Sequence, residues 1–318
     1  MKETAKQPLI ILTGPTAVGK TDLSIALAKR IEGEIISADS MQVYRGMDIG
    51  SAKIMPKQMG GILHHLIDVL EPTEEFNVAA FQQMAKQALP GIYARGRIPV
   101  VAGGTGFYIQ ALLYDIDFTE NDEDMALREE LQTIAQTKGC DALFERLRRI
   151  DPESCGIIHP NNVKRVIRAI EFYEKTGKKI SEHNKEQHQN DSPYRFAYFV
   201  LNDDREKLYR KIEARVDHMM EQGLVDEVAK LAASGCNCSM VSMQGLGYKE
   251  ILAYLEGHCT LEEAVYLIKR DTRHFAKRQL TWFRRERDVI WLEKQKYGGD
   301  ESKILDDMIA ILHDRKIL

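Results

Sequence analysis

The octapeptide GPTAVGKT, residues 14–21, has the residue types and spacing of a phosphate-binding loop, or P-loop. Gly14 and Gly19 let the backbone turn its N–H groups around an anion, Lys20 adds a positive charge, and the Thr21 hydroxyl can hold Mg²⁺. The helical pattern that follows offers its N-terminus, which also favours negative charge. The sequence therefore predicts a bound phosphate or diphosphate, and a fortuitous glycine-rich turn is the alternative.

The loop identifies phosphate groups on the ligand but does not identify the reaction. Enzymes that use ATP or GTP with such a loop usually have a second strand that ends in an Asp, which helps to hold Mg²⁺. The candidate strand here, RIPVVAGGTGFYI from Arg97 to Ile109, ends in glycines and contains no carboxylate. A small-molecule kinase therefore stays open as an interpretation but lacks its usual second signature.

A carboxylate follows another predicted strand. The apolar run EIISA is followed directly by Asp39 and Ser40. Ligands in open α/β sheets bind at the carboxyl ends of the strands, so we expect Asp39 to lie beside the P-loop. There it can accept a proton from a nucleophile that approaches the phosphate-bearing substrate. An Asp that only caps the next turn is the alternative.

Alternating strands and helices must position these residues. Strands are predicted at PLIILTG, EIISAD and RIPVVAGG, and later at AYFVLN and DVIWLE, and helical patterns separate the first three. Such alternation predicts a parallel sheet with helices on its faces. We therefore expect an α/β fold with a P-loop NTPase-like parallel sheet flanked by helices.

Residues 118–196 have a different character, with helix after helix and no convincing strand before their end. We predict a helical insertion domain there, and a discontinuous catalytic core made of residues 1–117 and 197–318. The last part of the core contains two long amphipathic helical stretches, EKLYRKIEARVDHMMEQGLVDEVAKLAASG and TLEEAVYLIKRDTRHFAKRQLTWFRRER.

Composition and charge narrow the class of protein. The net charge of −4 argues against a generally basic nucleic-acid binder, although a local basic stripe can still bind nucleic acid. The five cysteines show no spacing typical of a zinc site, which favours free thiols in a reducing cytoplasm. No apolar stretch approaches the roughly 20 residues of a membrane span, and the charged start does not read as a signal peptide. We expect a cytoplasmic protein, and nothing demands more than a monomer.

Several ordered segments together resemble one family. They are GPTAVGKT, ISADSMQVYRGMDIGSAK, VVAGGTGFYI and HPNNVKRVIRAIE, followed by IEARVDHMMEQGLVDEV, GLGYKE and AKRQLTWFRR. Together they resemble bacterial tRNA dimethylallyltransferase, also called isopentenyl-diphosphate:tRNA transferase. The resemblance runs from about residue 8 to about residue 292, and the set of motifs is far more specific than the P-loop alone.

The resemblance implies transfer of a dimethylallyl group from dimethylallyl diphosphate to N6 of adenosine 37 in tRNAs that read codons beginning with U. Diphosphate and N6-(dimethylallyl)adenosine are the implied products, and the anticodon stem-loop is the implied tRNA partner. One alternative is an adenylate dimethylallyltransferase of the cytokinin type, which prenylates free nucleotides. A kinase and a non-catalytic RNA-binding protein are the others.

The resemblance also implies roles for individual residues. Asp39 would accept the proton, Thr16 would lie near the bridging oxygen of the donor, and Arg215 would reach its diphosphate. Thr21 would hold Mg²⁺, the implied cofactor. The implied diphosphate-binding residues are Gly14, Pro15, Thr16, Ala17, Val18, Gly19, Lys20 and Thr21. Without the resemblance, Arg215 reads as a surface arginine.

Basic residues among aromatics suit a phosphate backbone and unstacked bases, and such a pattern surrounds Trp282 and Phe283. An ordinary amphipathic helix with Trp282 in the core is the alternative. The resemblance implies a set of tRNA-binding residues spread along the chain. They are Asp39, Ser40, Met41, Gln42, Thr105, Arg128, Lys164, Arg165, Lys277, Arg278, Gln279 and Arg284.

The adjacent His64 and His65 invite a metal interpretation. Neighbours on a strand or a helix point in different directions, so a structural pair is the favoured interpretation. A supporting role for these histidines and Asp68 behind the active site also stays open.

Overall fold

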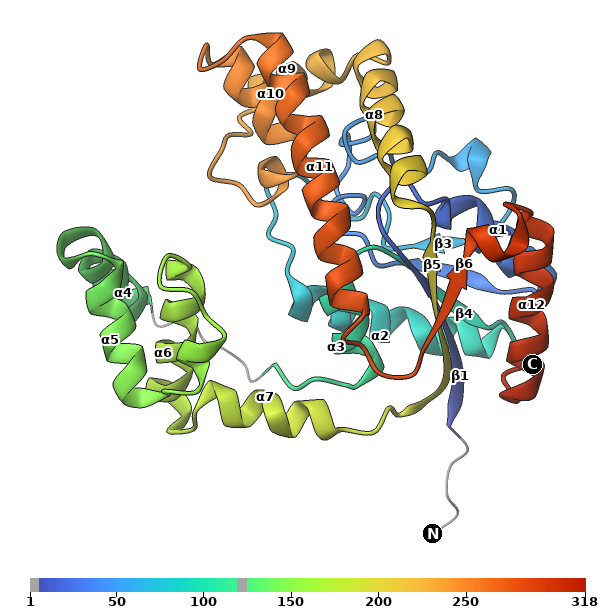
Figure 1. Ribbon diagram of the computed structural model, residues 1–318, viewed down its shortest axis with the longest axis horizontal. Helices are drawn as coiled ribbons and strands as arrows, with labels where there is room; N and C mark the ends of the chain where they lie inside the picture. Colours follow the sequence, from blue (N-terminus) through green and yellow to red (C-terminus); the bar gives the residue numbers. More distant parts are fainter. Residues whose placement is uncertain (1–5, 119–124) are drawn as a thin grey trace. The chain divides into compact units, whose positions relative to one another are not determined.

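The protein, described here by a computed structural model over residues 6–118 and 125–318, has a six-stranded parallel sheet in that part of the chain (Figure 1). The strands are β1 (Gln7–Thr13), β2 (Glu34–Ser37), β3 (His64–His65), β4 (Pro99–Gly103), β5 (Tyr194–Asn202) and β6 (Val289–Glu293). Their order in the sheet is β3-β2-β4-β1-β5-β6, and every pair is parallel. The predicted fold class is confirmed.

Twelve α-helices lie in the described residues. In the core they are α1 (Lys20–Arg30), α2 (Val78–Ala94), α3 (Gly106–Leu113), α8 (Arg205–Glu221), α9 (Leu224–Ala233), α10 (Tyr248–Leu255), α11 (Leu261–Phe283) and α12 (Glu301–Asp314). The remaining four are α4 (Met125–Lys138), α5 (Cys140–Ile150), α6 (Val163–Thr176) and α7 (Ile180–Gln189).

Strand β1 is the centre of the sheet because its residues are apolar on both faces. Its residues Leu9 to Leu12 are essentially buried, as expected for a strand covered on both sides. Ile10 pairs with Val100 of β4 on one side and with Ala197 of β5 on the other. Helices α1 and α12 pack together on one face, and α2 and α3 cover the other (Figure 1).

Local structure differs from the sequence prediction in two places. The two-residue strand β3 was not predicted, because so short a run carries no periodicity. The stretch predicted as one helix from Glu206 to Gly235 is two helices, α8 and α9, separated at Gly223. Gly223 has a φ of 95°, in the left-handed region that ends helices.

The chain divides into two compact units, one of residues 1–113 with 193–318 and one of residues 114–192. The insertion was predicted at residues 118–196, and the second unit begins and ends four residues earlier. In it α4, α5 and α6 share a core that includes Leu131, Leu147 and Ile170. The buried Asp151 accepts hydrogen bonds from the hydroxyl groups of Ser154 and Ser181, which fixes the start of α7.

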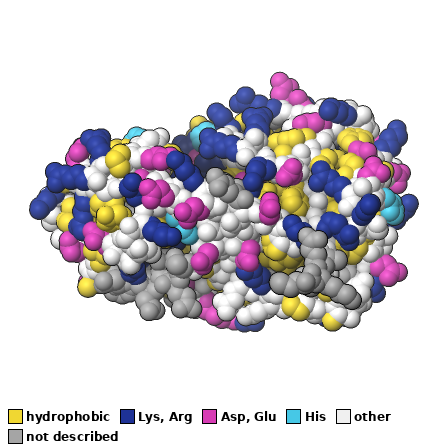
Figure 2. All heavy atoms as spheres, turned by 90° about the horizontal axis from the view of Figure 1, so that it is seen from below, with side chains coloured by type: hydrophobic (Ala, Val, Ile, Leu, Met, Phe, Trp, Pro, Cys, Tyr) yellow, Lys and Arg dark blue, Asp and Glu magenta, His cyan; other side chains and the backbone are white. Residues whose placement is uncertain are grey.

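No helix within residues 6–118 and 125–318 is both long enough and apolar enough to cross a membrane. All five cysteines have free thiols. On the face shown in Figure 2, Lys and Arg side chains are interspersed with Asp and Glu, so no single sign of charge covers it.

A buried carboxylate ties the start of β2 to its neighbours. Glu34 accepts two hydrogen bonds of 2.7 Å from the guanidinium group of Arg95, and its Oε2 lies 2.8 Å from His65 Nε2. The hydrogen bonds from Arg95 lower the pKa of Glu34, and the contact with His65 lowers it further, while burial opposes both.

We expect Glu34→Gln to lower the free energy of unfolding by about 1–3 kcal/mol at neutral pH, because the variant loses charge-assisted hydrogen bonds. The folded-state pKa of Glu34 lies below its unfolded value, so the ionised carboxylate stabilises the fold above that value and loses this effect as the pH falls. Urea unfolding should therefore show a difference from wild type that narrows below about pH 5.

Glu32→Gln is the matched control, since Glu32 pairs with Arg97 at the surface with its side chain 80% exposed. A loss of stability in Glu32→Gln as large as that in Glu34→Gln would contradict the role given to Glu34.

Candidate functional site

The predicted P-loop lies between β1 and α1, at the carboxyl edge of the sheet. Gly14 has a φ of 149°, and a Cβ there would lie 2.2 Å from the carbonyl oxygen of Leu201 in β5. Only glycine fits so close to the neighbouring strand. Ala17 and Gly19 also have positive φ, so the loop curls before α1 begins at Lys20.

The Lys20 ammonium group folds back over the loop. Its Nζ donates to the carbonyl oxygens of Gly14, at 3.0 Å, and Pro15, at 2.8 Å. Burial and, to a smaller extent, the nearby Arg215 lower the pKa of Lys20 to about 8, although the carboxylate of Asp39 opposes both effects. An anion in the loop would stabilise the protonated amine.

Asp39 follows β2, and its carboxylate performs the capping role that was the alternative interpretation. Asp39 Oδ1 accepts the N–H groups of Met41, at 2.8 Å, and Gln42, at 3.3 Å. In the described part of the chain no hydrogen bond is made to Oδ2. The cap therefore fixes the carboxylate and leaves its second oxygen for a proton, so the two interpretations are compatible.

Arg215 comes from α8 and is not a free surface arginine. Its Nη2 lies 3.5 Å from the carbonyl oxygen of Ser51. Burial lowers the pKa of Arg215, and the negative charge of Asp39 opposes this effect. The guanidinium group, the Lys20 ammonium group and the Asp39 carboxylate thus act on one another electrostatically at one place.

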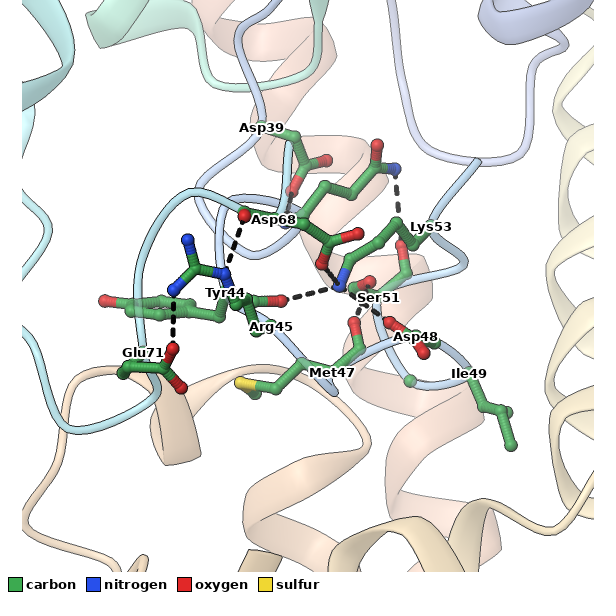
Figure 3. Close-up of polar contacts among 12 residues, drawn as sticks. Asp39, Tyr44, Arg45, Met47, Asp48, Ile49, Ser51, Lys53, Asp68 and Glu71 are labelled. Carbon is green, nitrogen blue, oxygen red and sulfur yellow. Dashed lines mark hydrogen bonds and ion pairs between the residues drawn. The ribbon is translucent and has the colours of Figure 1, made fainter. Parts of the chain in front are cut away.

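The loop that follows Asp39 is held by a second buried lysine (Figure 3). The side chain of Lys53 is 1% exposed, and its Nζ bonds the carbonyl oxygen of Tyr44 at 2.6 Å, Asp48 Oδ1 at 2.7 Å and Asp68 Oδ1 at 2.5 Å. Because three oxygens surround the ammonium group, its burial is compensated. Lys53 therefore joins two loops behind the site, and sequence reasoning did not single it out.

Gln279 of α11 joins the P-loop to the end of β4. Its Oε1 accepts the N–H of Thr16 at 2.9 Å, and its Nε2 donates to the carbonyl oxygen of Gly104 at 2.8 Å. Gln279 is 6% exposed. Gln279, which was predicted to bind tRNA, thus holds two loops of the site together.

These groups surround one cavity of about 740 Å³. Asp39, Lys20 and Arg215 all line it, although they come from the segment after β2, the P-loop and α8. The other predicted residues that line it are Thr16, Ala17, Gly19, Thr21, Ser40, Met41, Gln42, Thr105, Arg278 and Gln279. Gly14, Pro15 and Val18 belong to the same loop but are buried.

The remaining predicted tRNA-binding residues lie outside this cavity. Lys277 and Arg284 are exposed at the C-terminal part of α11 and just after it. Lys164 and Arg165 are exposed on α6 of the insertion unit, whereas Arg128 donates two hydrogen bonds to Glu171 there. Trp282 is partly buried, and its ring packs edge-to-face with that of Phe107.

The histidine pair is structural at one position and faces the cavity at the other. His65 bonds Glu34, while His64 lines the cavity and its Nδ1 lies 2.9 Å from the carbonyl oxygen of Ile62. Asp68 bonds Lys53. Within the described residues, no group of three or more His, Cys, Asp or Glu side chains is arranged to hold a metal ion.

Comparisons with known proteins match two family profiles and several solved or curated relatives. The IPP transferase family profile matches residues 42–286, and the isopentenyl transferase profile matches residues 7–70. The tRNA dimethylallyltransferase of Lachnoclostridium phytofermentans is 62% identical over 312 residues, which cover 98% of this chain and 99% of that protein.

Solved structures show the same likeness. The tRNA isopentenylpyrophosphate transferase of Bacillus halodurans is 42% identical, with a TM-score of 0.73 and 98% of both chains covered. A eukaryotic dimethylallyltransferase acting on tRNA is 31% identical, with a TM-score of 0.78, and the match covers 90% of this chain and 74% of that one.

We expect the affinity for inorganic pyrophosphate to fall as the pH rises through about 8, because Lys20 then loses the proton that an anion favours. Isothermal titration calorimetry across this range measures the effect. The Lys20→Arg variant keeps its charge and is the control for the ionisation of pyrophosphate itself. Identical pH profiles for the two proteins would show that Lys20 is not the titrating group.

Proposed function

Because the chain belongs to the tRNA dimethylallyltransferase family, and so transfers a dimethylallyl group to tRNA, we propose that its acceptor is N6 of adenosine 37 in tRNAs that read codons beginning with U. The proposed donor is dimethylallyl diphosphate. The observation that carries the proposal is the convergence of the P-loop, Asp39 and Arg215 on one cavity. A diphosphate-binding loop and a proton acceptor at one place are what this transfer requires.

In the proposed reaction the N6 lone pair attacks C1 of the dimethylallyl group. The bond between C1 and the bridging oxygen breaks, and its electron pair leaves with the diphosphate. N6 then carries an extra proton, which passes to the free Oδ2 of Asp39. Since the adenine amino group is a weak nucleophile, removal of that proton and stabilisation of the leaving group provide most of the catalysis.

The leaving diphosphate is stabilised by charges already in place. Lys20 would exchange its bonds to the carbonyl groups of Gly14 and Pro15 for bonds to the diphosphate. Arg215 adds a second positive charge, and Thr16, which also lines the cavity, would lie near the bridging oxygen. Such preorganised donors are effective because they need no rearrangement as charge develops.

Mg²⁺ is part of the proposal, and Thr21 is the side chain that would hold it. Thr21 lines the cavity next to Lys20, and the described residues offer no all-protein metal cage. This suits Mg²⁺, which commonly takes one or two protein ligands together with phosphate oxygens and water. When bound, the ion supplies charge neutralisation on the diphosphate.

The proposed tRNA partner is the anticodon stem-loop, because a base can be extruded most readily from a single-stranded loop. Exposed Lys277 and Arg284 beside the cavity-lining Arg278 suit the phosphate backbone there, as do exposed Lys164 and Arg165 of the insertion unit. We propose a monomer as the catalytic unit. We place the reaction in the cytoplasm.

The test is mass spectrometry of nucleosides from an unmodified tRNA with A36-A37-A38, after incubation with the protein, Mg²⁺ and dimethylallyl diphosphate. N6-(dimethylallyl)adenosine at position 37 is expected. AMP as a parallel acceptor tests the cytokinin-type alternative, and ATP as a parallel donor tests the kinase. Product on AMP alone, or phosphate transfer from ATP alone, would overturn the proposal.

We expect Asp39→Asn to lower kcat by about 10²–10⁴, the range of general-base catalysis, with little change in tRNA affinity. Asparagine keeps an oxygen that can cap Met41 and Gln42, so the loop is preserved while the base is lost. Asp39→Ala removes both and should be at least as inactive. A fully active Asp39→Asn enzyme would reduce Asp39 to its capping role.

We expect Lys277→Gln and Arg278→Gln each to flatten the salt dependence of tRNA binding by about one unit of log–log slope, as for the loss of one phosphate contact. Filter binding at several salt concentrations measures this slope. Lys303→Gln is the control, because Lys303 is exposed on α12. An unchanged slope in the α11 variants would assign those residues to an ordinary solvated face.

A further inference from the structure

The segment that follows Asp39 is held by a carboxylate from a distant helix. Glu227 of α9 accepts the N–H groups of Asp48 at 3.0 Å and Ile49 at 2.8 Å on its Oε2, and that of Gly50 at 3.1 Å on its Oε1. Three successive backbone N–H groups thus converge on one carboxylate, as they do around a bound anion.

Tyr248 of α10 completes this contact. Its hydroxyl group donates to Glu227 Oε1 at 2.8 Å and accepts the N–H of Ser51 at 3.2 Å, and its side chain is fully buried. The ring lies so close to Gly50 that a Cβ there would be 2.6 Å from it. Glycine at position 50 therefore lets the segment approach both side chains.

No cation forms an ion pair with Glu227 in the described part of the chain. Its negative charge is stabilised by hydrogen bonds from four neutral donors, three of which are backbone N–H groups of one segment. Hydrogen bonds to a carboxylate are stronger than those to a neutral group. The carboxylate of Glu227 therefore holds residues 48–51 in place through these hydrogen bonds, directly and through Tyr248.

The other side of the same segment faces the cavity. The carbonyl oxygen of Ser51 lies 3.5 Å from Nη2 of Arg215, and Gln42 Nε2 donates to the carbonyl oxygen of Ala52 at 3.3 Å. Ser51 and Ala52 themselves line the cavity. A shift of this segment would therefore move the groups that hold Arg215 and Gln42.

We propose that Glu227, together with Tyr248, is a positioning residue for dimethylallyl transfer: it fixes residues 48–51 and through them orients Arg215 and Gln42 in the cavity. The proposal rests on the proposed function, since that gives Arg215 its role on the donor diphosphate. It also gives a physical role to the segments GLVDEV and GLGYKE, which contribute Glu227 and Tyr248.

The loop that contains residues 48–51 has a second anchor, Lys53. Because of it, a change at Glu227 can alter the position of the loop without unfolding it. Lys53 fixes Tyr44, Asp48 and Asp68 through its buried ammonium group, and this group forms no hydrogen bond or ion pair with Glu227. A variant at Glu227 therefore keeps the loop attached and changes its placement.

The test is Glu227→Gln, which is nearly isosteric but presents an N–H₂ group to donors. We expect kcat/KM for dimethylallyl diphosphate to fall about 10- to 100-fold, as for other residues that orient active-site groups, with KM for tRNA within about threefold. Tyr248→Phe, which removes one of the four donors, should have the same pattern and a smaller effect. Faster deuterium exchange at residues 48–50 should accompany the loss.

Glu34→Gln is the matched control, because it removes a buried carboxylate at the opposite edge of the sheet. It should lower stability without changing kcat/KM for the donor. An equal kinetic loss in Glu34→Gln, or wild-type donor kinetics in a folded Glu227→Gln, would overturn the positioning role.

A double variant with Arg215→Lys tests the route of the effect. If Glu227 acts through Arg215, kcat/KM of the double variant should be no more than about threefold below that of the less active single variant. Two residues that act independently would instead give losses that multiply. Pyrophosphate binding by calorimetry should be weakened by Glu227→Gln in the same way. Multiplied losses, or unchanged pyrophosphate binding, would contradict the inference.

These measurements also distinguish failure of the inference from failure of the proposed function. If wild-type enzyme does not form N6-(dimethylallyl)adenosine at position 37, the proposed function fails. If the wild-type enzyme does form it, and Arg215→Lys lowers kcat/KM for the donor but Glu227→Gln does not, only the inference fails.

Discussion

The parallel pairing of β1 with β4 on one side and β5 on the other is the constraint on which the site depends. It brings the carboxyl ends of several strands to one edge, so that the P-loop, Asp39 and the end of β4 meet there. The P-loop packs so closely against β5 that a side chain at position 14, where the protein has Gly14, would collide with Leu201. The positions of the P-loop and of Asp39 follow from this edge.

Electrostatics then sets the state of the groups at that edge. Lys20 and Arg215 are two cations in one partly buried place, which costs free energy, and Asp39 offsets part of that cost. A diphosphate would offset the rest. The protein thus keeps an excess of positive charge near the P-loop while its net charge is −4.

Much of the sheet and part of the site were predictable from the sequence, because their signals are local. Apolar runs bounded by turn residues predict β1, β2, β4, β5 and β6, and the P-loop spacing predicts the anion site. Contacts between residues far apart have no local signal. Glu227 binds amides 177 to 179 positions away, and Gln279 bonds Thr16 across 263 positions. A lysine buried among oxygens, such as Lys53, reads in the sequence as an ordinary surface residue.

The insertion lies between β4 and β5 in the sequence, and this has a consequence for synthesis of the chain. Strand β1 begins at Gln7, but its partner β5 begins only at Tyr194, so one side of the central strand lacks its hydrogen-bonding neighbour until about two thirds of the protein has left the ribosome. An unpaired strand edge is a template for wrong pairing. The insertion unit is contiguous and carries its own core, so its contacts are complete by Ser192. The ribosome therefore delivers a unit with a complete core before the sheet around β1 can close.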